Sequence, residues 1–245
     1  MCGRYAAAME IEDLVGAFDA RAVDVGEWRP KGSVNITSMP PVLFEQLSAG
    51  GEIERVVTRA RWRFVPEREE DFRAPPLTNA RLDKITRWSG WKDSFARHRL
   101  IVPMTGYYEF VEMVIDGKKV KQPYFIHDPD GEILLAAGLY NVGHDPKADY
   151  TGLGFTIITT DGVDAAGEVH DRMPVFLPPD AVDDWLQPGD WDVKARKAWK
   201  ERLGTISVPV SRRLVAHPTS RALNNTRTVR VDDLSLMDPI ELPED

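Results

Sequence analysis

The chain has 245 residues, of which 42% are hydrophobic and 29% charged, and its formal net charge is -8. This length suits one α+β domain or two small ones, and the apolar share suffices for a full core. The negative charge argues against a protein that coats nucleic acid non-specifically, because that mode neutralises many phosphates, but it does not exclude a local basic cleft.

The single cysteine, Cys2, directly follows the first methionine. One cysteine excludes an internal disulfide, and no apolar run follows a basic segment near the start, so we expect a cytoplasmic protein without signal peptide or membrane span. One cysteine and five scattered histidines offer no ligand pair at chelating spacing, so no metal is expected. No glycine-rich phosphate loop is present either, and we expect no cofactor.

The first predicted element is a helix within residues 9–24, where Ile11, Leu14, Val15 and Phe18 recur at helical spacing. From residue 33 the pattern changes to short segments rich in strand-forming residues. These predicted strands lie within residues 33–47, 53–65, 100–115, 124–128, 133–142, 154–160 and 174–178.

Turn signals at 116–117 and 129–131 indicate antiparallel meanders, and the spacing is too tight for βαβ crossovers. Two later helices are expected over residues 180–186 and 193–203, the second ended by Gly204. The predicted fold class is α+β, with an antiparallel, partly barrel-like sheet and flanking helices. Without repeats or a linker, we expect a single domain over residues 1–230, followed by a loosely ordered acidic tail over 231–245.

Positive charge gathers in two neighbouring segments. Residues 55–63 hold four arginines and no acid, and residues 81–99 hold six Lys or Arg against two acids. A solvated face is one interpretation. The interleaved Trp62, Trp88 and Trp91 favour single-strand binding instead, although buried core tryptophans would give the same pattern.

Several polar residues interrupt apolar segments. Glu109 lies between two aromatic residues, and strand alternation places it on the face of Tyr107, where a carboxylate is either buried or beside a cleft. His170 precedes an apolar strand, and Asn79 follows a proline-rich loop. Taken singly, a histidine is more often structural and a loop asparagine a turn former.

The motifs MCGRYA, NAR, VPMTGYYEF, AAGLY and TIITTDGVDAAGEVHDRMPVFL occur in the order and spacing of the SRAP (SOS response-associated peptidase) family. The chain resembles that family from Met1 to about Leu177, and more weakly to about Val215. The resemblance implies a monomer of the DNA damage response that senses abasic sites in single-stranded DNA. Members cross-link to the site through the N-terminal cysteine and shield it, and the peptidase name reflects removal of the first methionine.

The chemistry also follows from Cys2 itself. An abasic sugar opens to an aldehyde, and an α-amine, with a pKa of about 7.7 to 8.0 against about 10.4 for lysine, is the better nucleophile near neutral pH. After a Schiff base forms, the tethered thiol can close a thiazolidine ring. A minor β-elimination, seen as AP-lyase activity, is a possible side reaction.

The resemblance assigns roles to the remaining positions. Glu109 would shuttle protons, His170 would act as general acid toward the ring oxygen, and Asn79 would orient the sugar or amine. Each could instead be a cleft-edge hydrogen bond without a chemical role. The candidate DNA contacts are Gly3, Arg4, Trp62, Arg81 and Arg172.

Two other function classes stay open. Class II glutamine amidotransferases also begin with MCG, but the chain lacks their glutamine-binding segments. A non-catalytic DNA-binding or protein-binding module of the same fold is the third interpretation. The chain departs from the usual family residues at Ser38, Arg63, Phe64, Leu82, Asp83 and Phe110. These departures leave its preference for particular DNA junctions open.

Overall fold

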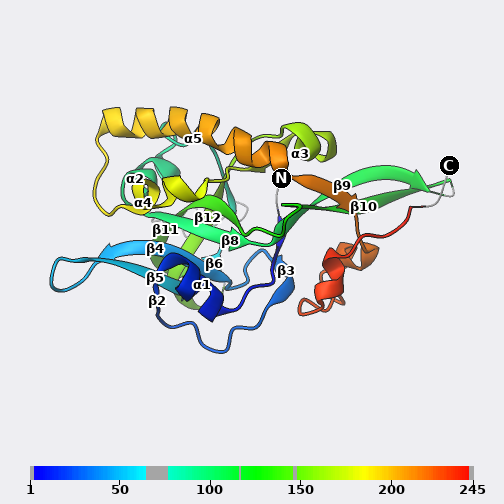
Figure 1. Ribbon diagram of the computed structural model, residues 1–245, viewed down its shortest axis with the longest axis horizontal. Coiled ribbons are helices and arrows are strands. Elements are labelled where there is room, and N and C mark those ends of the chain that lie inside the picture. Colours follow the sequence, from blue (N-terminus) through cyan, green and yellow to red (C-terminus); the bar gives the residue numbers. More distant parts are fainter. Residues whose placement is uncertain (1–2, 65–76, 116, 146–147, 243–245) are drawn as a thin grey trace.

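The computed structural model describes residues 3–64, 77–115, 117–145 and 148–242. Within them, the strands form two sheets, and Figure 1 shows most of the helices over one side of the larger sheet, with the dark-blue helix near the start of the chain on the other side. The smaller sheet contains, in spatial order, β14 (Val215–Pro218), β10 (Lys118–His127), β9 (Gly106–Ile115), β1 (Arg4–Ala7) and β3 (Lys31–Asn35).

The larger sheet follows the order β13 (Arg172–Pro174), β12 (Tyr150–Asp161), β11 (Leu134–Asp145), β8 (Arg99–Met104), β4 (Pro41–Leu47), β5 (Ile53–Arg59) and β2 (Arg21–Ala22). Two further strands, β6 (Arg61–Trp62) and β7 (Asn79–Arg81), pair with β12 in parallel. Most other pairs are antiparallel, and the described strands close no barrel. The predicted α+β class is therefore confirmed.

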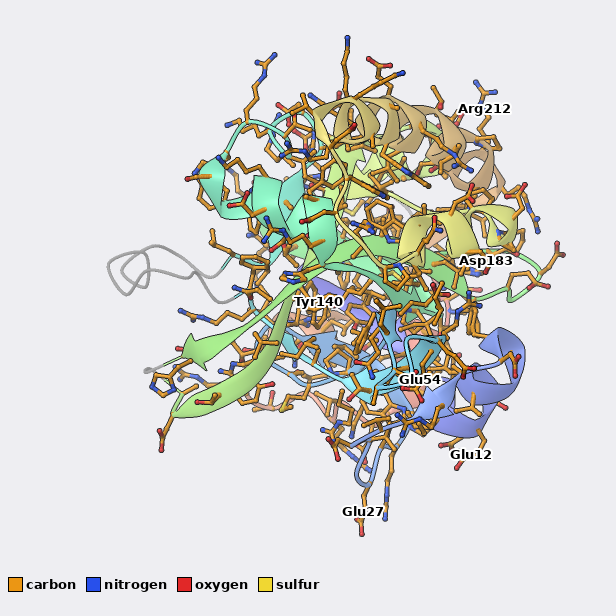
Figure 2. All side chains as sticks on the ribbon, turned by 90° about the vertical axis from the view of Figure 1, so that its left-hand side faces the viewer. Glu12, Glu27, Glu54, Tyr140, Asp183 and Arg212 are labelled. Carbon is orange, nitrogen blue, oxygen red and sulfur yellow. The ribbon has the colours of Figure 1, made fainter. Side chains whose placement is uncertain are left out.

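The β9–β10 hairpin projects away from the helices (Figure 1). Gly117, in the predicted turn, has φ of 71°, a conformation that glycine adopts without steric cost. Three charged side chains, those of Glu12, Glu27 and Arg212, lie at the periphery and point away from the sheets (Figure 2).

The described helices are α1 (Ile11–Phe18), α2 (Ser89–Arg97), α3 (Asp164–Val169), α4 (Val182–Leu186) and α5 (Val193–Arg213). The predicted end of α5 at Gly204 is wrong. The helix continues because Ser207 and Ser211 are buried beyond it, and the Ser207 hydroxyl accepts the N–H of Phe176 at 2.9 Å. This packing outweighs the roughly 1 kcal/mol that an interior glycine costs.

The described part of the predicted tail packs on the smaller sheet. The carbonyl of Val231 accepts the N–H of Ser33 at 3.1 Å, and Leu236 is buried. Gly32 permits this approach, since a Cβ there would lie 1.9 Å from the carbonyl oxygen of Asp233. Residues 231–242 are thus ordered against the smaller sheet. The domain boundary at residue 230 stays a prediction. No described helix is long and apolar enough to cross a membrane.

Candidate functional site

β1 lies beside β9, the strand that carries Glu109. The two strands are antiparallel, with Tyr5 opposite Tyr107 and Ala6 opposite Gly106. Because the strands are antiparallel, moving toward the N-terminus along β1 corresponds to moving toward the C-terminus along β9. Gly3, which precedes β1, therefore lies near the level of Glu109. Cys2 lies outside the described residues, so its part in the site stays a prediction.

The Glu109 side chain is buried within the sheet. It is 3% exposed, and its residue pairs with Tyr124 of β10. Burial raises the pKa of Glu109 to about 7, and the charge of Asp171 acts in the same direction. A carboxyl group with this pKa can both take up and release a proton at neutral pH.

His170 follows α3 and faces Glu109. Its Nε2 atom lies 3.9 Å from Oε2 of Glu109. The Nδ1 atom accepts the backbone N–H of Arg172 at 2.9 Å and also lies 2.8 Å from Oδ1 of Asp171. Burial lowers the pKa of His170. These contacts hold the ring so that Nε2 faces the carboxyl group of Glu109.

Asn79 is the first residue of β7, the strand that pairs in parallel with β12. Its residue is opposite Ile157, and its amide nitrogen donates to the hydroxyl of Thr78 at 3.3 Å. The backbone segment after His170 becomes β13, which also pairs with β12. The structure thus brings Glu109 and His170 together and places Asn79 on a neighbouring strand of the larger sheet.

The three candidate arginines differ in exposure. Arg172 is buried, and its guanidinium donates to the carbonyl of Thr159 and to Asp161, both at 2.7 Å. Arg4 is buried as well and donates to the carbonyl of Leu223. The side chain of Arg81 is 48% exposed and pairs with Asp83 at 3.0 Å.

Arg81 is therefore the one of the three whose side chain is open to a DNA phosphate. Arg4 and Arg172 instead hold strands and turns in place.

The structure corrects the predicted stacking role of Trp62. Its side chain is fully buried, its indole N–H donates to the carbonyl of Thr78 at 3.0 Å, and its ring stacks on Phe155. A ring with both faces covered offers no platform for a base. Trp91 is also buried, whereas Trp88 is 41% exposed.

Two departures from the family pattern have partners of their own. Arg63 forms an ion pair at 3.1 Å with Asp145, whose side chain is fully buried. Phe64 packs edge-on against Trp91, with 5.0 Å between ring centroids. Sequence analysis missed Asp145, because a carboxylate at the end of a strand resembles an ordinary turn residue. Among the described residues, no group of three or more His, Cys, Asp or Glu could hold a metal ion.

Comparison with known proteins gives consistent relatives. The abasic site processing protein YedK of Escherichia coli is 28% identical over 230 residues, covering 93% of this chain and 96% of YedK. The abasic site processing protein HMCES of Xenopus tropicalis is 29% identical over 266 residues, covering 93% of this chain and 76% of HMCES.

Solved structures share the fold. A protein from Bacteroides thetaiotaomicron aligns with a TM-score of 0.72 at 21% identity, over 98% of this chain and all of that one. A phage-related protein from Bordetella bronchiseptica aligns with a TM-score of 0.66 at 27% identity, over 90% of this chain and 95% of that one. The family model described as SOS response associated peptidase (SRAP) matches residues 1–226, and the chain belongs to this family.

Proposed function

We propose that this protein processes abasic sites in single-stranded DNA by linking itself to them covalently through Cys2, once Met1 has been removed. The observation that carries the proposal is the pair of buried Glu109 and partly exposed His170, at the level toward which β1 leads through Gly3. The names of the relatives, abasic site processing proteins, agree with it.

The reaction uses both nucleophiles of Cys2. The α-amine adds to the C1′ aldehyde of the opened sugar, and the carbinolamine loses its hydroxyl as water to give an imine. The thiol then adds to the imine carbon, its proton passing to the nitrogen. One C–N and one C–S bond form, one water leaves, and the product is a thiazolidine that shields the lesion.

Glu109 and His170 move the protons of this sequence. With a pKa of about 7, Glu109 accepts a proton from the amine and returns it to the departing hydroxyl. His170, whose Nε2 faces Glu109, acts as acid toward the sugar ring oxygen, which favours the open aldehyde. Asn79 orients the sugar or the amine, and the exposed Arg81 contacts phosphate.

Two minor activities belong to the proposal. Removal of Met1 at the same site exposes the α-amine, and the family name reflects this step. The imine also permits β-elimination of the 3′ phosphate, a weak AP-lyase activity that competes with ring closure. Fast closure by a thiol on the same residue keeps strand cleavage minor.

The test is a denaturing gel of the processed protein with single-stranded DNA holding one abasic site. A heat-stable shifted band is expected for the wild type. The matched controls are Cys2→Ser, which keeps the amine but lacks the thiol, and intact DNA of the same sequence, and neither gives a heat-stable band. A wild-type protein with Met1 removed that forms no band contradicts the proposal.

A further inference from the structure

A cleft of about 560 Å³ lies between the segment entering α2 and the first half of α5. Its walls concentrate positive charge in a chain whose net charge is -8. The charged side chains lining it are Arg87, Lys92, Arg196, Lys197 and Lys200, with Glu201 as the acidic member.

One face of α5 forms a wall of this cleft. Val193, Arg196, Lys197, Lys200 and Glu201 all line it, and their spacing of three and four residues puts them on one side of the helix. Like charges four residues apart, as at 196 and 200, destabilise a helix, so helix stability does not explain this face. Among the described residues, the ion pairs of α2 and α5 are made by other cations, namely Arg97, Arg202, Arg212 and Arg213.

A second cavity of about 250 Å³ shares Lys200 with the cleft, and its lining also includes Arg81 and Arg172 as well as Asp83 and Asp161. The Lys200 ammonium donates to the carbonyl of Asp83 at 3.0 Å, which joins α5 to the segment after β7. Arg172 follows His170 by two residues, so a strand held at Glu109 and His170 can extend past this cavity toward Lys200.

An exposed tryptophan neighbours the lining residues Arg87 and Lys92. Trp88 directly follows Arg87, its carbonyl accepts the N–H of Lys92, and its side chain is 41% exposed. Its ring lies against Trp91 and over Gly90, where a Cβ would come within 2.3 Å of the ring. Cations that track a phosphate backbone beside an exposed aromatic ring are typical of single-strand binding, since an unpaired base can stack on the ring.

We infer that this cleft binds single-stranded DNA flanking the abasic site, with phosphates on Arg87, Arg196 and Lys197 and a base stacked on Trp88. The choice of DNA as the ligand rests on the proposed function. Duplex DNA would offer the same phosphates, but its stacked bases would leave Trp88 unused.

Fluorescence anisotropy of a labelled, intact oligothymidylate tests this with the full chain across a salt series. The cleft variant, R87Q/R196Q/K197Q, replaces three cations of the cleft by glutamine. The matched variant, R29Q/K118Q/K119Q, removes the same charge from exposed positions outside the cleft. Each single-strand phosphate contact contributes about 0.7 to the slope of log affinity against log salt, so the cleft variant should lower the slope by about 2. The matched variant should leave it near the wild-type value.

Trp88 supplies the second arm. Trp88→Ala should weaken binding at least about fivefold, and Trp88→Phe should retain it. Equal slopes for the cleft and matched variants, a Trp88→Ala affinity like the wild type, or duplex binding that depends equally on Trp88 would overturn the inference. A failure of the proposed function would be detected in a separate experiment, in which the wild-type protein forms no adduct on abasic DNA.

Discussion

Nε2 of His170 lies 3.9 Å from Oε2 of Glu109, although one side chain follows α3 and the other belongs to β9. Burial moves the two pKa values in opposite directions, raising that of Glu109 and lowering that of His170. In both cases the neutral form is favoured, because the low-dielectric surroundings penalise charge. The pair therefore holds exchangeable protons near neutral pH, which the proposed reaction needs.

Glu109→Gln should stabilise the protein at alkaline pH. The Glu109 pKa is raised from 4.5 to about 7, so between these values the folded state holds a proton that the unfolded state has lost, and stability falls as pH rises. Above pH 7 the wild type carries the full penalty, up to about 3 kcal/mol. Denaturant unfolding at pH 5 and pH 8 measures it.

In that experiment, Glu112→Gln is the control, because Glu112 is exposed on the same strand. It should change stability little at either pH. A Glu109→Gln variant that is equally destabilised at both pH values would contradict the burial argument.

The rate of adduct formation should rise with pH through about 7, as Glu109 ionises and becomes a base. Glu109→Gln should lower the rate by about a hundredfold or more and remove this inflection. Single-turnover gels over pH 5.5 to 8.5 give the profile, with Glu112→Gln again as control. An unchanged inflection in Glu109→Gln would assign it to another group, such as the α-amine.

Arg172→Ala and Arg81→Ala should separate structure from DNA contact. Arg172 donates to Thr159 and Asp161 from a buried position, so its loss should cost roughly 2 kcal/mol of unfolding free energy. Arg81 is half exposed, and its loss should cost under about 0.5 kcal/mol while weakening DNA binding. Thermal melts and anisotropy measure the two effects, and the reverse ranking of stability would be incompatible with the observed contacts.

Leu236→Ala tests whether the C-terminal segment belongs to the domain. Leu236 is 3% exposed, and truncating a buried leucine costs about 2 to 5 kcal/mol. Leu234, two residues earlier, is 43% exposed and is the matched control, with a cost below about 1 kcal/mol. Equal, small effects on denaturant unfolding would show that the segment contributes nothing to the fold.

Local patterns predicted the strands well, because alternation and turn residues are encoded within each hairpin. The same alternation predicted that Glu109 is either buried or beside a cleft, and its side chain is buried. The end of α5 was missed because Gly204 is a local stop signal, whereas Ser207 and Ser211 are anchored by distant partners.

Exposure was the weakest prediction. Trp62 and Trp88 occur in similar basic surroundings along the chain, yet one is core and the other surface. The difference comes from β6 pairing with β12, which covers the Trp62 ring with Phe155. Likewise, the sequence predicts Arg172 as a phosphate contact, whereas the pairing of β13 with β12 places its guanidinium against Thr159. Such outcomes depend on long-range pairing, which neither composition nor spacing reveals.

The most direct test of the covalent link through Cys2 is the intact mass of the adduct with an abasic oligonucleotide, followed by mapping of the modified peptide. The expected mass is that of the protein lacking Met1 plus the DNA minus one water, and the adduct should form without a reductant and lie on Cys2. An adduct that needs borohydride trapping, or that lies on a lysine, would contradict the thiazolidine chemistry.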